Sequence, residues 1–137
     1  MLIVPFIQKD RLKLDHVMVC WDGSRAAARA VADAMPFLTR SGKASIIVAD
    51  IQSAKSADLP GADIATHLTR HGVNGTIERF PVSKIDVSNA ILSYAADTYP
   101  DLIVMGGYGH SRLREFILGG TTRGMLISMT KPTLMSH

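Results

Sequence analysis

The chain has 137 residues, of which 47% are apolar and 20% charged, and its formal net charge is +3. This length and apolar content suit one domain with a single core and exclude a disordered chain. The weak positive charge, without a basic stripe or interleaved aromatic residues, disfavours nucleic-acid binding. No apolar run is long enough to span a bilayer, and the opening residues 1–7 lack a basic leader. We therefore expect a cytoplasmic protein without a membrane partner.

The first half of the chain alternates between short apolar runs and helical periodicity. The predicted elements are a buried strand at 16–21, a helix at 24–40, a strand at 44–49, a loop at 52–59 and a helix from Pro60 to Gly72. Asp22-Gly23-Ser24 stops the first strand and supplies the signal for a helix start. The single Cys20 excludes an intrachain disulfide, and its apolar neighbours favour a buried, unreactive thiol.

The second half repeats this alternation. Its predicted elements are a less apolar strand at 76–80, a helix at 86–98, an apolar strand at 101–105, a helix around Met125, Leu126 and Met129, and a short strand at 132–136. Strands that alternate with helices predict right-handed crossovers, and continuously apolar strands predict a sheet covered on both faces. The fold class is therefore doubly wound α/β with a parallel sheet.

Residues 1–14 do not resemble the beginning of an α/β domain. Leu2-Ile-Val-Pro5 is more similar to the closing Thr133-Leu-Met-Ser136 than to a first strand. Two interpretations follow: a tail that packs on the sheet, or the last strand and linker of a preceding domain of a tandem protein. In both, residues 15–137 form the domain.

Two glycine clusters enclose the segment between the fourth strand and the last helix. They are Gly106-Gly107-Tyr108-Gly109 and Gly119-Gly120-Thr121-Thr122. Glycines let the backbone approach a ligand, and successive N–H groups together with a helix N-terminus bind anions. The spacing matches neither the Rossmann fingerprint nor the Walker A loop. The clusters therefore predict a phosphate site of another type, unless they only form turns.

Asp22 is the candidate for the other side of this site. Ligands of doubly wound sheets bind beyond the carboxyl ends of the strands, where the strand order reverses. If the first and fourth strands are neighbours, Asp22 and Gly106 face one crevice, and the Asp22 carboxylate can accept hydrogen bonds from ribose. The alternative role of Asp22 is that of a turn or N-cap residue.

The glycine segment closely resembles a known signature. Gly106-Gly-Tyr-Gly-His-Ser-Arg-Leu-Arg-Glu-Phe-Ile-Leu-Gly-Gly120 is similar to the universal stress protein pattern Gly-x2-Gly-x9-Gly-Ser/Thr/Asn, and Val17-Met-Val-Cys-Trp-Asp-Gly-Ser24 resembles the first strand and acidic turn of that family. The resemblance covers residues 16–136. It implies an adenine-nucleotide alpha-hydrolase-like fold, an open five-stranded parallel sheet of order 3-2-1-4-5 with helices on both faces.

The resemblance also implies a ligand and a partner. In ATP-binding members the signature binds phosphates, the acidic residue binds ribose, and backbone after the second strand touches adenine. The residues carried over are Asp22, Gly106, Gly109, Gly119 and Thr121, with Ala49 and Asp50 as weaker candidates. The implied cofactor is ATP, with or without Mg²⁺. Family members form dimers, and pairing through the last strand, here 133–136, is a common route.

One departure from the signature leaves the function open. Gly120 stands where ATP-binding relatives carry Ser, Thr or Asn, so a phosphate-binding hydroxyl is missing unless Thr121 or Thr122 replaces it. This loss favours, as an alternative, a dimeric interaction module that does not bind ATP. His110 beside the phosphate loop suggests a third possibility, a slow ATP hydrolase or adenylate-transfer enzyme.

Other candidate sites are weak. No nucleophile–base pair is recognisable, so no catalytic residue is assigned. His67 and His71 have the i, i+4 spacing of metal ligands but no further ligand nearby in the sequence, which favours a solvated helix face and no metal site.

Overall fold

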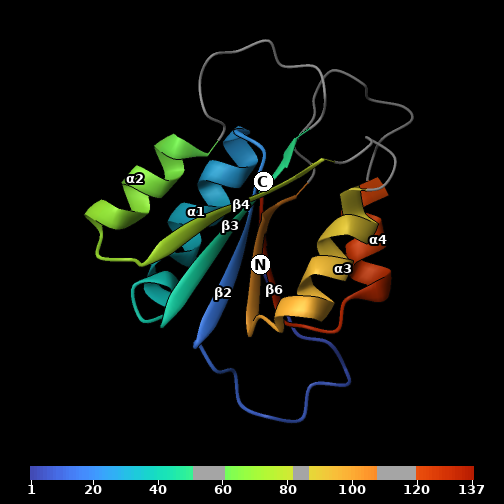
Figure 1. The fold of residues 1–137 in the computed structure, drawn as a ribbon. Helices are drawn as coiled ribbons and strands as arrows, with labels where there is room; N and C mark the ends of the chain where they lie inside the picture. The colour runs from blue at the N-terminus through green and yellow to red at the C-terminus, as the bar shows by residue number, and fades with distance from the viewer. Residues whose placement is uncertain (51–60, 82–86, 108–119) are drawn as a thin grey trace.

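The computed structural model describes residues 1–50, 61–81, 87–107 and 120–137, which form a six-stranded sheet with helices on both faces (Figure 1). The elements in chain order are β1 (Leu2–Ile3), β2 (His16–Trp21), α1 (Arg25–Leu38), β3 (Lys43–Asp50), α2 (Ala62–Arg70), β4 (Gly75–Pro81), α3 (Val87–Thr98), β5 (Leu102–Gly106), α4 (Gly120–Ser128) and β6 (Thr133–Ser136). The sheet order is β1-β6-β5-β2-β3-β4.

The doubly wound α/β class is confirmed, with one correction. The five predicted strands are β2 to β6, and their order β4-β3-β2-β5-β6 is the expected 3-2-1-4-5 with every pair parallel. The expectation of five parallel strands is wrong at the edge, where β1 pairs antiparallel with β6. The likeness of residues 2–5 to the last strand does not reveal this pairing, because its partner is more than a hundred residues away in the sequence.

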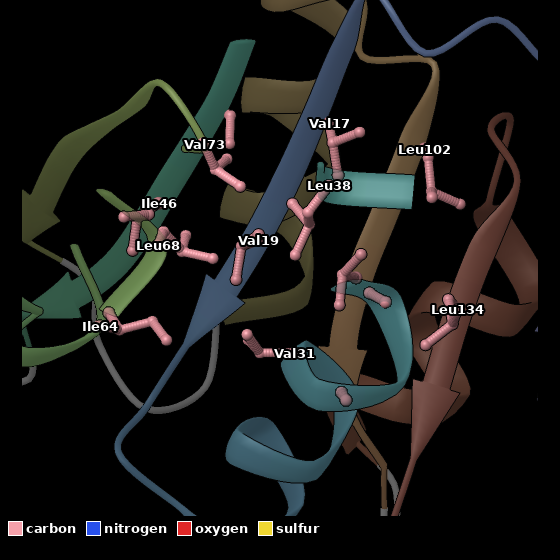
Figure 2. Close-up of a cluster of buried hydrophobic side chains, with 14 of the residues drawn as sticks. Val17, Val19, Val31, Leu38, Ile46, Ile64, Leu68, Val73, Leu102 and Leu134 are labelled. Atoms are coloured by element: carbon pink, nitrogen blue, oxygen red, sulfur yellow. The ribbon is translucent and has the colours of Figure 1, made fainter. Parts of the chain in front are cut away.

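The first face of the sheet is covered by α1 and α2 (Figure 1). Figure 2 shows the side chains packed beneath these two helices, including Val17 and Val19 of β2, Leu38 of α1 and Leu68 of α2. Both central strands, β2 and β5, are buried along most of their length. This continuous burial agrees with strands that are covered on both faces.

Helix α1 owes its close approach to the sheet to small side chains. Its inward face is Ala26, Ala27, Ala30, Val31, Ala34 and Leu38, all buried. Pro36 lies in the last turn of the helix on its exposed side. The carbonyl that loses its intrahelical hydrogen bond to this proline belongs to Ala32, which is also exposed, so water can satisfy it.

The second face is covered by α3 and α4 and has a different composition. Its buried cluster contains four methionines, Met18, Met105, Met125 and Met135, together with Ile47, Ile91, Ala95 and Ile103. Gly124 of α4 lies against Ser88 of α3: a Cβ at position 124 would meet the Ser88 Oγ at 2.9 Å. The two helices therefore pack closely at this point.

The N-terminal segment joins the domain at two places. Ile3 of β1 packs partly against the methionine-rich cluster, and Leu12 and Leu14 pack against the core beneath α1 and α2. The carbonyl oxygen of Leu14 accepts a hydrogen bond from the N–H of Gly42 at 3.0 Å.

Candidate functional site

The carboxyl ends of the parallel strands define one end of the sheet. The register places Cys20 of β2 beside Met105 of β5, so Asp22 and Gly106 follow on neighbouring strands. The chain leaves β2 towards β3 on one side and β5 towards β6 on the other, which makes this the point where the strand order reverses. Figure 1 shows that α4 also begins at this end of the sheet. The expected convergence of the first strand, the fourth strand and the last helix is therefore present.

The turn after β2 is held by its own polar side chains. The Asp22 Oδ1 accepts a hydrogen bond from the Ser24 N–H at 2.9 Å, and the Ser24 Oγ accepts one from the Ala27 N–H at 3.1 Å. Ser24 is the N-cap of α1, and Gly23 between them has a φ of 72°, where glycine is favoured. Asp22 is exposed at the surface. The alternative role of Asp22, that of a turn residue, is thus observed.

Gly106 is explained by packing within the domain. A Cβ at this position would lie 2.7 Å from the Ala27 nitrogen and 2.9 Å from the Ala26 carbonyl carbon. Both are backbone atoms of the first turn of α1, which cannot move without shifting the helix. The first signature glycine therefore brings β5 into contact with the start of α1, the role of the packing glycine in other doubly wound folds.

The next residue continues the sheet. The Gly107 N–H donates to the Ser136 carbonyl at 2.7 Å, so this amide serves the pairing with β6. Beyond it, Gly109, His110 and Gly119 lie outside the described residues, and their proposed contacts with phosphate stay predictions.

The second glycine cluster opens α4. Gly120, Thr121 and Thr122 form its first turn, where backbone N–H groups have no acceptor within the helix. Thr122 is only 6% exposed, so its side chain belongs mainly to the interior. An anion at this helix start would meet backbone N–H groups before it met the Thr122 hydroxyl.

The weaker candidates lie at the end of β3. Ala49 and Asp50 pair with Phe80 and Pro81 of β4, and β3 is the direct neighbour of β2. The backbone at 49–50 therefore reaches the same end of the sheet as Asp22.

The Cys20 thiol is not suited to a reactive role at this site. Burial of the thiol, with a smaller contribution from the charge of Asp22, raises its pKa to about 12, although the residue as a whole keeps some exposure. A thiol with such a pKa is neutral at physiological pH and is a poor nucleophile. This agrees with the structural role predicted for Cys20.

Two polar contacts at the end of β6 were not predicted. The Ser136 Oγ donates to the Asp33 Oδ2, and the Arg29 Nη1 donates to the His137 carbonyl at 2.9 Å. Arg29 and Asp33 are four residues apart, hence on one side of α1. The spacing of Arg29 and Asp33 can be read from the sequence. Their contact with the end of β6 cannot, because it depends on the order of the strands in the sheet.

A buried polar network occupies the opposite end of the sheet. The His16 Nε2 lies 2.8 Å from the Ser45 Oγ, and its Nδ1 lies 3.3 Å from the Thr98 carbonyl oxygen. Because a carbonyl only accepts, Nδ1 carries the proton and Nε2 accepts from the Ser45 hydroxyl. The backbone N–H of His16 also donates to the Asp101 Oδ2 at 3.0 Å. Burial lowers the pKa of His16.

In the parts of the chain that the structure describes, no group of three or more His, Cys, Asp or Glu side chains is placed to hold a metal ion. The His67 and His71 rings lie 4.5 Å apart, with the His71 Nδ1 2.9 Å from the His67 carbonyl oxygen. No helix within the described ranges is long and apolar enough to cross a membrane.

Comparison with known proteins identifies relatives of this fold. A universal stress protein of Synechocystis sp. is 42% identical over 45 residues, which are 33% of this chain and only 16% of that protein. A universal stress protein structure from Archaeoglobus fulgidus DSM 4304 aligns with a TM-score of 0.69 at 23% identity, over 90% of this chain and 44% of that chain. A universal stress protein crystallised in complex with cAMP aligns with a TM-score of 0.61 at 25% identity, over 90% and 96% of the two chains.

The family model described as the universal stress protein family matches residues 13–137, nearly the whole chain. The match includes the turn after β2, the end of β5 and the start of α4. The chain belongs to the universal stress protein family.

Proposed function

We propose that this domain binds an adenine nucleotide, ATP with or without Mg²⁺, at the carboxyl ends of β2 and β5. The observation that carries the proposal is the meeting of the Asp22 turn, the end of β5 and the start of α4 at one end of the sheet, where the strand order reverses. The related universal stress protein in complex with cAMP supports an adenine nucleotide as the class of ligand.

The exposed Asp22 carboxylate is suited to the ribose. Its Oδ1 accepts the Ser24 N–H, which fixes the carboxylate relative to the end of β2. A carboxylate held in this way can accept hydrogen bonds from ribose hydroxyls without much further loss of side-chain entropy. The backbone of Ala49 and Asp50, one strand away, is our candidate for contact with adenine.

The phosphates are assigned to the start of α4 and to the glycine segment before it. The first turn, from Gly120 to Thr122, offers backbone N–H groups and the positive end of the helix dipole. Gly109, Gly119 and His110 complete this part of the proposal. Because Gly120 has no hydroxyl, one charge-assisted hydrogen bond worth about 1.5–3 kcal/mol is missing, which weakens binding by roughly one to two decades.

Calorimetric titration with ATP, in the presence and absence of Mg²⁺, tests the proposal. We expect saturable binding that Asp22→Ala weakens by about tenfold or more, because a hydrogen bond to a charged group is lost. Asp97→Ala is the matched control: it removes an exposed carboxylate at the end of α3, near the opposite end of the sheet. Absence of binding at about 1 mM ATP, with the protein folded, contradicts the proposal.

A second candidate is an interaction module of the same fold that binds no ATP. It is favoured by Gly106, whose presence is fully explained by contact with α1, and by the missing hydroxyl at Gly120. This candidate predicts a dimer or domain pair that forms regardless of nucleotide, which light scattering with and without ATP measures; a strictly monomeric protein at high concentration contradicts it. The stress-response role, the cytoplasmic location and the tail or linker role of residues 1–14 stay predictions in either case.

A further inference from the structure

Trp21 is the last residue of β2 and the single tryptophan of the chain. It follows Val17 and Val19 on the face of the sheet beneath α1 and α2, and it packs against the same core. The two valines are fully buried, whereas Trp21 is only partly buried. The row of small branched side chains along β2 thus ends in a large aromatic ring that keeps part of its surface exposed.

The two helices on this face begin on either side of β2, at the carboxyl end of the sheet. The first turn of α1 lies against β5, because a Cβ at Gly106 would be 2.7 Å from the Ala27 nitrogen. The start of α2 lies against β3, because a Cβ at Gly61 would be 2.8 Å from the Val48 Cγ2. Since β2 lies between β5 and β3, Trp21 ends the strand that runs between the two helix starts.

The neighbours of Trp21 belong to the proposed nucleotide site. Asp22 follows it directly in the chain, and Val48 lies opposite it on β3, one residue before Ala49. In a nucleotide, the ribose joins the phosphates to the base. If the ribose lies at Asp22 and the phosphates lie at the start of α4, which follows β5, the base extends to the other side, over the ends of β2 and β3. Trp21 supplies an aromatic ring at that place.

We infer that Trp21 stacks on the base of the nucleotide and gives the site a preference for purines. This inference rests on the proposed function, and it adds a contact for the face of the base to the backbone at 49–50, our candidate for contact with its edge. Every base has a π-face that an aromatic side chain can bind, and a purine, with two fused rings, offers more of it than a pyrimidine.

The intrinsic fluorescence of Trp21 tests the contact in the unmodified protein, because the chain has no other tryptophan. We titrate the protein with ATP and, in parallel, with tripolyphosphate, which lacks the base, and excite the indole at a wavelength that adenine does not absorb. ATP should quench the emission with the same Kd that calorimetry gives, and tripolyphosphate should leave the emission unchanged. If ATP binds in the calorimeter and the emission does not change, the inference is overturned and the proposed function stands. Absence of ATP binding overturns both.

Substitutions separate stacking from the structural role of the indole. We expect Trp21→Leu to weaken ATP binding about tenfold or more and CTP binding by a smaller factor, so that the preference for ATP over CTP becomes smaller. Trp21→Phe keeps an aromatic face and should retain most of the affinity for ATP. A merely structural role would change the affinities for ATP and CTP by the same factor.

Phe37→Leu is the matched control. Phe37 is also partly buried and packs against the core beneath α1 and α2, but it lies in the last turn of α1, at the other end of that helix from Asp22. Its substitution should leave both affinities unchanged. A folded Trp21→Leu variant that binds ATP as tightly as the parent, or that loses equal factors for ATP and CTP, overturns the inference. If Trp21→Leu does not fold, the fluorescence titration and Trp21→Phe decide.

Discussion

The two ends of the sheet are built in opposite ways. At the amino ends of the strands, the His16 side chain is buried and both ring nitrogens have partners inside the domain. At the carboxyl ends, the Asp22 residue is exposed, and Gly106 lets the end of β5 approach the first turn of α1. The amino end buries a polar side chain that lies away from the proposed nucleotide site, whereas the carboxyl end carries the residues of that proposed site. Substitutions at the amino end should therefore change stability alone, whereas substitutions at the carboxyl end, where Gly106 and Ser24 also hold α1, test stability and the proposed binding separately.

Gly106→Val should cause the largest loss of stability, because position 106 is in close contact with the backbone of α1. Such a loss would show that the carboxyl end of the sheet also contributes to stability. The added Cβ would lie 2.7 Å from the Ala27 nitrogen, a backbone atom that cannot move aside. We expect a loss of about 3 kcal/mol in the free energy of unfolding, at the upper end for overpacked sites.

Urea denaturation of the Gly106→Val variant measures this loss. Gly23→Ala is the matched control, since no atom lies within 4 Å of its Cβ and only the φ of 72° opposes the change, at a cost of about 1 kcal/mol. Equal losses for the two variants would mean that the contact with α1 is unimportant.

Gly120→Ser should increase nucleotide affinity without changing stability. It restores the hydroxyl of the family signature at the start of α4, and we expect nucleotide affinity to increase by roughly one to two decades. Calorimetric titration with ATP measures the gain. An affinity that does not change, while the protein stays folded, would show that the hydroxyl at 120 does not reach the phosphates.

His16→Gln should have the smallest effect and act only on stability. We expect a loss of about 1 kcal/mol at neutral pH, the net value of a hydrogen bond. Nucleotide affinity should stay unchanged, because the network lies at the other end of the sheet from Asp22.

The His16 network also predicts a pH dependence. Burial, followed by the charge of Lys43, lowers the pKa of His16 from its usual 6.5, and the hydrogen bond to Thr98 and the charge of Asp101 oppose this less strongly. The unfolded chain therefore takes up a proton near pH 6.5 while the folded chain does not. The free energy of unfolding should fall as the pH drops below 6.5, and level off below the folded pKa.

Urea denaturation at a series of pH values checks this, with His16→Gln as the comparison. The part of the slope that comes from His16 should disappear in the variant. A slope that is identical in both proteins would assign the pH dependence to other groups.

Much of the fold could be predicted because its signals are local. The apolar run 16–21 coincides with β2, and Ser24 is the N-cap of α1, as its position after the Asp-Gly turn indicates. The less apolar strand at 76–80 is indeed at an edge of the sheet, where Glu78 and Arg79 are exposed. Periodicity and capping act over a few residues, so a single sequence contains them.

The remaining features depend on contacts between distant parts of the chain. The likeness of residues 2–5 to the last strand indicates a strand or a packed tail, but the antiparallel pairing of β1 with β6 joins residues at opposite ends of the sequence and could not be predicted. His16 finds its partners on β3 and at the end of α3, so nothing near it in the sequence predicts the network. The signature marks Gly106 as a candidate phosphate residue. Its close contact with Ala27 could not be predicted, because it depends on how α1 packs on β5.

The methionine-rich face of the sheet has a consequence for how the domain tolerates change. Methionine side chains are unbranched and adopt many rotamers at little cost, so the layer between the sheet and α3 and α4 can repack around a volume change. Among the described residues, the fully buried part of the opposite layer contains no methionine, and α1 packs there through its own alanines against branched side chains. The layer beneath α3 and α4 should therefore tolerate changes of side-chain volume better than the layer beneath α1.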